Sequence, residues 1–177
     1  MSDTTPKSRK LTRLPDYDYA QPGAYFVTIV SEGRVELFGH IQNDIMCLSV
    51  PGGIVWQVWD DLPNHYGYIQ LDAFVVMPNH VHGIIILTEP AGVGEGLSPS
   101  PTNGEPKPHG LPEIVGQLKS YSTRRINQWR RTPGMTVWQR SFHDRIIRND
   151  RELTATREYI ANNPLRWALD TENPANH

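Results

Sequence analysis

Two histidines separated by one residue, His80 and His82, are the side chains in this 177-residue sequence whose spacing first suggests chemistry. They begin an apolar run, His80 to Leu87, that is rich in β-branched residues and typical of a buried strand. Because residues i and i+2 of a strand point to the same face, the two imidazoles are predicted to lie side by side. Neutral imidazoles bind Mn²⁺, Fe²⁺, Co²⁺ or Zn²⁺, and together with oxygen donors they also suit Mg²⁺. The pair therefore predicts half of a metal site, with two unrelated hydrogen-bonded histidines as the alternative.

A tyrosine and an asparagine form a second group near the end of the sequence. Tyr159 and Asn163 are four residues apart in a segment predicted to be helical, so they share one face of that helix. If this face packs against His80 and His82, the Asn163 side-chain oxygen can be a third ligand and the Tyr159 hydroxyl can reach a metal-bound group. A core tyrosine beside an asparagine helix cap is the alternative interpretation.

Basic residues are concentrated in one part of the chain, although the formal net charge is −2. Between residues 119 and 151, nine lysines and arginines face only two aspartates. Such a segment can contact nucleic-acid phosphates, or it can be a solvated helix face that is neutralised from elsewhere. The candidates for phosphate contact are Lys119, Arg124, Arg125, Arg130 and Arg131.

The elements that must position these residues follow from hydrophobic periodicity and from turn residues. The predicted strands are 24–31, 68–76, 80–87 and 137–147, with a small hairpin from 35–41 and 45–48. The predicted helices are 51–62, 111–131 and 149–163, the last opened by a capping box at Asn149 and Glu152 and stopped by Pro164. The order β-α-β-β-α-β-α predicts an α+β fold, ferredoxin-like in plan, with a four-stranded antiparallel sheet and helices packed on one face.

The length indicates one domain, predicted at 14–170. Residues 1–13 are expected to be a flexible basic arm, 88–110 a mobile insertion rich in Gly and Pro, and 171–177 a tail. A single cysteine, Cys47, excludes an internal disulfide framework. The sequence shows neither a secretory signal nor an apolar run of about 20 residues, so we expect a soluble cytoplasmic protein with no membrane partner.

Several of these segments resemble one protein family. Val75–His82 (VVMPNHVH) resembles the His-hydrophobic-His signature of single-tyrosine transposases, the HUH family. Residues 159–164 (YIANNP) resemble the catalytic-tyrosine helix of REP-associated tyrosine transposases, which are relatives of the insertion-sequence-200-like enzymes. Residues 15–28 and 138–148 also resemble stretches of that family, so the resemblance extends from residue 11 to about residue 167.

The resemblance implies roles for four residues: His80 and His82 as metal ligands, Tyr159 as the nucleophile, and Asn163 as a third ligand where many members have glutamine. It implies a Mg²⁺- or Mn²⁺-dependent transposase that cleaves and joins single-stranded DNA at or near hairpins through a 5′-phosphotyrosine. Its partners would be single-stranded DNA and DNA hairpins. No nucleotide cofactor is expected, since the sequence has no phosphate-binding Gly-x-x-x-x-Gly-Lys motif. A monomer is favoured and a dimer is possible.

Several alternatives stay open. The protein could bind DNA hairpins without cleaving them, or it could activate water as a metal-dependent nuclease in which Tyr159 is only structural. Tyr121 is a rival nucleophile, although its place on an apolar helix stripe predicts burial. His143 and Asp144 could supply or orient a ligand, or they could form an ordinary pair at a strand edge.

Overall fold

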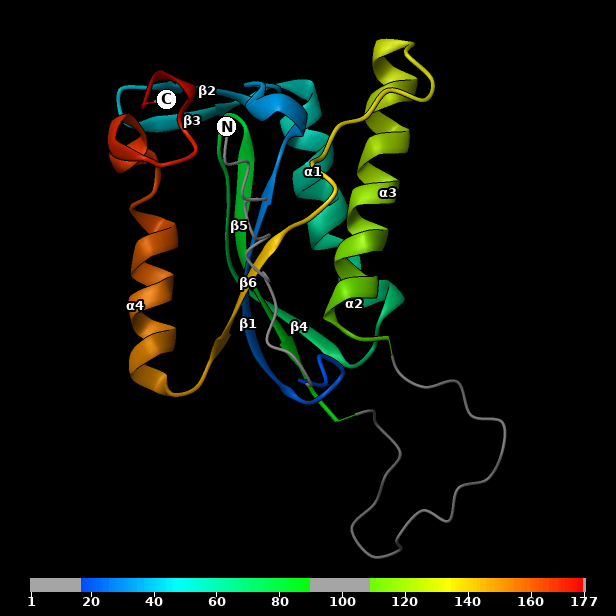
Figure 1. Ribbon diagram of the computed structural model, residues 1–177, viewed down its shortest axis with the longest axis vertical. Helices are drawn as coiled ribbons and strands as arrows, with labels where there is room; N and C mark the ends of the chain where they lie inside the picture. The colour runs from blue at the N-terminus through cyan, green and yellow to red at the C-terminus, as the bar shows by residue number, and fades with distance from the viewer. Residues whose placement is uncertain (1–16, 90–108, 177) are drawn as a thin grey trace, which may run out of the picture.

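The computed structural model describes residues 17–89 and 109–176 of the chain (Figure 1). The expected basic arm at 1–13 lies outside the described residues. So does the expected insertion at 88–110, apart from residues 88–89 and 109–110.

A four-stranded antiparallel sheet forms the centre of the molecule, with the strand order β4-β5-β1-β6. Its strands are β1 (Gly23–Val30), β4 (Ile69–Val76), β5 (His80–Leu87) and β6 (His143–Ile147). The predicted α+β fold with a four-stranded antiparallel sheet is thereby confirmed. The central strands β1 and β5 pair along their whole length. His80 lies opposite Val30, and His82 lies opposite Thr28.

Helices cover both faces of this sheet (Figure 1). One face carries α1 (Val50–Asp60), the short α2 (Leu62–His65) and the long α3 (Leu111–Arg130), and the other carries α4 (Asp150–Ala161). The prediction that all helices lie on one face is therefore wrong. It failed because the central strands are apolar on both sides, so each face needs a cover.

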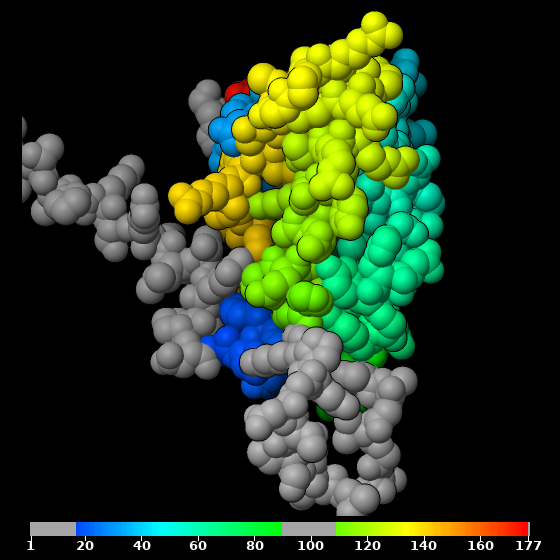
Figure 2. Space-filling model, turned by 90° about the vertical axis from the view of Figure 1, so that its right-hand side faces the viewer, coloured from blue at the N-terminus to red at the C-terminus, as the bar shows by residue number. Residues whose placement is uncertain are grey.

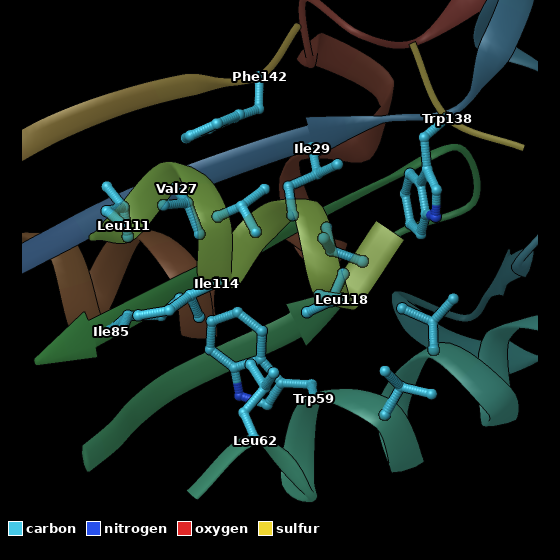
Figure 3. Packing of buried hydrophobic residues seen from close by; sticks show 14 of the residues in the cluster. Val27, Ile29, Trp59, Leu62, Ile85, Leu111, Ile114, Leu118, Trp138 and Phe142 are labelled. Carbon is cyan, nitrogen blue, oxygen red and sulfur yellow. The ribbon is translucent and has the colours of Figure 1, made fainter. Parts of the chain in front are cut away.

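The alternation of residues along β1 and β5 separates two apolar clusters. Val27, Ile29 and Ile85 point into the larger cluster, where they meet α1 and α3 (Figure 3). Phe26 and Ile84 point the other way, into a smaller cluster with Ile160 of α4. His82 is two residues before Ile84 in β5. Residues at this spacing in a strand point to the same face, so the His82 side chain is on the α4 face.

The predicted strands 137–147 and 35–41 both begin later in the structure than expected. The segment 137–147 is a strand only from His143, and before that point it meets the sheet through a single bridge between Ser31 and Trp138. The carbonyl oxygens of residues 139–141 accept hydrogen bonds from the Lys119 ammonium. The small hairpin consists of β2 (Gly39–Gln42) and β3 (Ile45–Leu48), and residues 32–34 before it form a 3-10 turn, η1 (Glu32–Arg34).

The ends of α4 determine where the candidate site residues lie. The Asn149 side chain accepts a hydrogen bond of 2.9 Å from the Glu152 N–H, as the predicted capping box requires. The helix ends at Ala161, earlier than predicted, and is followed by two 3-10 segments, η2 (Pro164–Leu169) and η3 (Pro174–Asn176). Among the described helices, none combines the length and apolar character that a bilayer crossing requires.

Candidate metal centre and nucleophile

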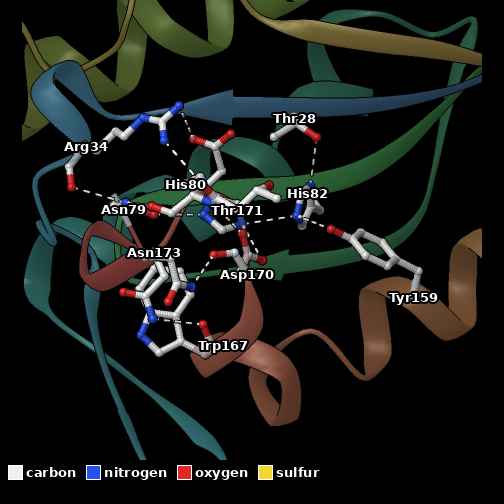
Figure 4. A network of polar contacts seen from close by, with 12 residues as sticks. Thr28, Arg34, Asn79, His80, His82, Tyr159, Trp167, Asp170, Thr171 and Asn173 are labelled. Carbon is white, nitrogen blue, oxygen red and sulfur yellow. Dashed lines mark hydrogen bonds and ion pairs between the residues drawn. The ribbon is translucent and has the colours of Figure 1, made fainter.

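His80 and His82 lie side by side at the start of β5, as the strand pattern predicts. Their Nε2 atoms are 3.0 Å apart, and both rings are almost completely buried (Figure 4). The Nδ1 atom of His80 lies 2.8 Å from the Asn79 side-chain oxygen, which can only accept, so His80 donates from Nδ1. The Nδ1 atom of His82 lies 2.8 Å from the Thr28 hydroxyl. The Thr28 hydroxyl can donate or accept, so it can accept the Nδ1 proton that His82 carries when its Nε2 binds a cation. In that tautomer both Nε2 atoms are free to bind the same ion.

Both histidines are neutral at physiological pH. Burial, together with a smaller effect of the nearby Arg34 charge, lowers the pKa of His80 to about 3. The pKa of His82 is also lowered to about 3, mainly by burial and less by His80, with Asp170 opposing the shift. The neutral imidazole is the form that binds a metal ion.

A carboxylate that the sequence patterns did not indicate completes this group. The Asp170 Oδ2 atom lies 3.9 Å from His80 Nε2, and the Asp170 side chain is only 6% exposed. Because His80 is neutral, this contact is not an ion pair. His80, His82 and Asp170 can each offer one ligand atom to a metal. These three atoms lie within 4.8 Å of one another. Asp170 follows η2 in a segment without helix or strand periodicity, so only the acidic character of Asp170 and Glu172 hints at a ligand there.

The geometry fits a divalent cation. Nitrogen ligands bind such ions at about 2.1 Å, so two ligands at right angles lie about 3 Å apart, which matches the Nε2–Nε2 distance of the two histidines. Two imidazoles with one carboxylate also leave open positions for further oxygen ligands, such as those of a phosphate. The group of His80, His82 and Asp170 can therefore hold a divalent metal.

Tyr159 reaches this group from α4. Its hydroxyl is 3.3 Å from His82 Nε2, and its ring packs edge-on against His82 and Phe26. The side chain is 39% exposed, so a substrate can approach it. Burial raises the pKa of Tyr159, and Asp170 raises it further, whereas a hydrogen bond from the Asn163 side chain lowers it. The phenol is consequently protonated at neutral pH.

Asn163 lies just beyond α4 and is 1% exposed. Within the described part of the chain, its side-chain oxygen is buried without a hydrogen-bond partner. A buried acceptor without a partner is costly, by about 1–3 kcal/mol, and is uncommon in folded proteins. An atom in this state is available for a cation, so Asn163 stays a predicted ligand beside Asp170.

Lys119 has a structural role in the described structure. Its ammonium donates to the carbonyl oxygens of Gln139, Arg140 and Ser141 at 2.9, 3.3 and 2.9 Å. These bonds tie α3 to the segment that leads into β6. A contact between Lys119 and a DNA phosphate stays a prediction, and it would compete with these bonds.

The remaining predicted DNA-binding residues lie on α3 or at its end, on the sheet face opposite the histidines: Arg124, Arg125, Arg130 and Arg131. Figure 2 views this side of the molecule, with α3 in yellow-green across it. Arg125 donates to Gln57, Arg130 donates to Asn127, and Arg124 lies over the Tyr121 ring. A groove of about 490 Å³ beside α3 includes Lys119, Arg124 and Arg140 in its lining. The fold therefore does not bring these basic residues to the His80–His82 pair.

The alternative site residues lie on different faces of the sheet: Tyr121 is away from the histidines, whereas His143 shares their face. Tyr121 is 43% exposed and stacks on His65, so its predicted burial is wrong. It lies on α3 and therefore on the other side of the sheet from His82. His143 lies opposite Thr28 of β1, and Thr28 lies opposite His82 of β5, so His143 is on the histidine face of the sheet, two strands away. Neither His143 nor Asp144 belongs to the possible metal-binding group found among the described residues.

Comparisons with known proteins give a relative and a shared fold. No model of a known protein family matches the chain. A Haemophilus influenzae protein described as an uncharacterized protein is 34% identical over 165 residues, which cover 92% of this chain and 91% of that protein. The chain belongs to the family of this Haemophilus influenzae protein.

A solved structure of a REP-associated tyrosine transposase bound to a REP hairpin is also similar. Its TM-score is 0.58 at 17% sequence identity, and the match covers 87% of this chain and 73% of that chain. The two proteins share a fold.

Proposed function

We propose that this protein is a metal-dependent single-strand DNA endonuclease and strand transferase of the tyrosine-transposase type, acting at or near DNA hairpins. The observation that carries the proposal is the 3.3 Å distance from the Tyr159 hydroxyl to Nε2 of His82, a member of a buried group able to hold a metal. The fold shared with a transposase bound to a REP hairpin supports DNA as the substrate.

In this proposal His80 and His82 hold Mg²⁺ or Mn²⁺ together with oxygen ligands from Asp170, Asn163 or both. Such a cation, when bound, withdraws charge from a non-bridging phosphate oxygen and orients the phosphorus for in-line attack. Thr28 and Asn79 fix the ring orientation of the two histidines through their Nδ1 atoms.

Tyr159 is the proposed nucleophile. Its oxygen forms a bond to the scissile phosphorus while the bond from phosphorus to the 3′ oxygen breaks. The phenolic proton is lost and the departing oxygen gains one, leaving a 5′-phosphotyrosine and a free 3′-OH. The raised pKa of Tyr159 makes loss of its proton unfavourable unless positive charge lies nearby. Because one phosphodiester is exchanged for another, a 3′-OH can reverse the step and join a strand, with no nucleotide cofactor.

The position of α3 suggests how a hairpin is held. Arginines on α3 supply phosphate contacts on one face of the sheet, and Tyr159 acts on the other face. The proposed DNA path therefore runs around the β6 edge, where the Lys119 contacts join α3 to the segment that leads into β6. In this proposal the histidines and the tyrosine of one chain act together, and the protein works as a monomer.

The proposal is tested by covalent capture. The full-length protein is incubated with labelled single-stranded hairpin oligonucleotides and Mn²⁺ and then run on a denaturing gel. We expect a slow protein–DNA band with the unmodified chain and with Tyr121→Phe, the matched control. The Tyr159→Phe variant should lose the band and keep DNA binding in a native gel.

Two other outcomes would contradict the proposal. Cleavage that continues in Tyr159→Phe without an adduct would indicate a nuclease that activates water. Binding of hairpins without any adduct or cleavage by the unmodified chain would indicate a binding protein.

A further inference from the structure

The segment that carries Asp170 is tied down by two residues from distant parts of the chain. Arg34, in the 3-10 turn after β1, forms an ion pair of 3.3 Å with Glu172 and donates to the Thr171 carbonyl at 3.3 Å (Figure 4). The Glu172 oxygen in this pair makes no hydrogen bond within the described residues, so Arg34 is its partner. The Glu172 side chain is 15% exposed and the Arg34 side chain 36%, so solvent reaches the pair mainly from the arginine side.

Asn79 links the same segment to a histidine. Its side-chain oxygen accepts from Nδ1 of His80 at 2.8 Å. Its side-chain nitrogen donates to the carbonyl oxygens of Glu172 and Arg34, at 2.6 and 3.1 Å. One fully buried amide therefore sets both the ring orientation of His80 and the position of the segment after η2.

The Asp170 carboxylate is oriented by the part of the chain that Arg34 and Asn79 hold. Its Oδ1 atom accepts from the Glu172 N–H at 2.7 Å, and its Oδ2 atom lies 3.9 Å from Nε2 of His80. The turn is closed by the Asn173 N–H, which donates to the Asp170 carbonyl at 3.2 Å. A shift of residue 172 would move the oxygen that faces the histidines.

We propose that Arg34 and Asn79 are positioning residues that hold Asp170 as an oxygen ligand of the divalent cation bound by His80 and His82. This inference rests on the metal site of the proposed function. Residues 170–173 lie mostly outside regular structure, and keeping them in one conformation costs entropy. The Arg34–Glu172 pair and the Asn79 hydrogen bonds offset that cost. Cation binding and order in this segment then stabilise each other.

The test measures binding of Mn²⁺ alone to the metal-free full-length protein, by calorimetry and by electron paramagnetic resonance. We expect Arg34→Ala to weaken binding about tenfold, as for other residues that orient metal ligands. Asp170→Asn should weaken it at least as much. In the Asp170→Asn background, Arg34→Ala should cause little further loss, because Arg34 acts through Asp170. Arg151→Ala removes an exposed arginine of α4 and should leave the affinity unchanged.

Thermal unfolding in EDTA checks that each variant is folded. Asn79→Leu removes both links and should weaken Mn²⁺ binding more than Arg34→Ala does; if it fails to fold, the arginine variant still decides. Wild-type Mn²⁺ affinity in Asp170→Asn, with binding lost in His80→Ala, would overturn the inference. Equal losses from Arg34→Ala with and without Asp170 would also overturn it. Covalent DNA capture is a separate measurement, so Mn²⁺ binding as expected without a DNA adduct would refute only the proposed function.

Discussion

Replacing Thr28 by valine would test how the metal ligands are oriented. Valine has nearly the same shape as threonine, so the change removes the hydroxyl beside Nδ1 of His82 with little change in volume. The contact is 2.8 Å long, and both residues are buried, with 8% and 3% exposure. Water therefore cannot easily replace the lost partner.

The expected magnitude follows from the tautomer of His82. A cation at Nε2 requires the His82 proton on Nδ1, where the Thr28 hydroxyl can accept it. Without the hydroxyl, a proton left on Nδ1 is buried and unpaired, which costs about 1–3 kcal/mol. The ring then shifts its proton to Nε2, where it must be displaced before a cation can bind. We expect Mn²⁺ affinity to fall by about tenfold to a hundredfold, the range typical for such partners of ligands.

The measurement is Mn²⁺ titration by calorimetry, with denaturant unfolding in EDTA as the stability check. Ser122→Ala is the matched control: this buried hydroxyl accepts from the Trp138 indole at 2.9 Å, on the α3 side of the sheet. The control should lower the free energy of unfolding by about 1–3 kcal/mol and leave Mn²⁺ affinity unchanged. Unchanged Mn²⁺ affinity in Thr28→Val would refute the argument that Thr28 sets the tautomer of His82.

Two further predictions concern stability. A Cβ atom at Gly83 would overlap the Trp59 ring, so Gly83→Ala should lower the free energy of unfolding in urea by about 1–3 kcal/mol; a variant as stable as the unmodified chain would contradict this packing. His80 and His82 have pKa values of about 3 in the folded protein and about 6.5 when unfolded. Between pH 6.5 and pH 3, therefore, the unfolded state binds these protons and the folded state does not. In EDTA, the free energy of unfolding should therefore decrease from pH 7 to pH 5, less steeply in a variant with both histidines changed to asparagine. A decrease as steep in that variant would show that other groups cause it.

The parts of the site that could be predicted are those that depend on local periodicity. Strand geometry alone places His80 and His82 on one face, and the structure confirms this with an Nε2–Nε2 distance of 3.0 Å. The Asn149 cap marks where the last helix begins, but the helical spacing of Tyr159 and Asn163 was extended too far, because α4 ends at Ala161 and Asn163 lies beyond it. Each prediction concerns neighbours along the chain, whose relative positions the backbone geometry determines.

The sheet face on which each helix packs was not predictable in the same way. The residues of β1 and β5 are apolar on both faces, so their pattern does not say which helix covers which side. The arrangement of all the elements in space places α4 over the histidines and α3 on the opposite face. The basic residues of α3 therefore lie away from the histidines, although the charge pattern of the sequence suggested a shared role.

For the site, the sequence by itself determined the two imidazoles and the nucleophile candidate, His80, His82 and Tyr159. Only the tertiary structure showed that Asp170 joins them. That carboxylate is brought in by a segment with no regular periodicity, held through Arg34 and Asn79. The physical reason is that a strand or helix repeat relates residues only a few positions apart. Contacts between distant segments depend on how the whole chain packs.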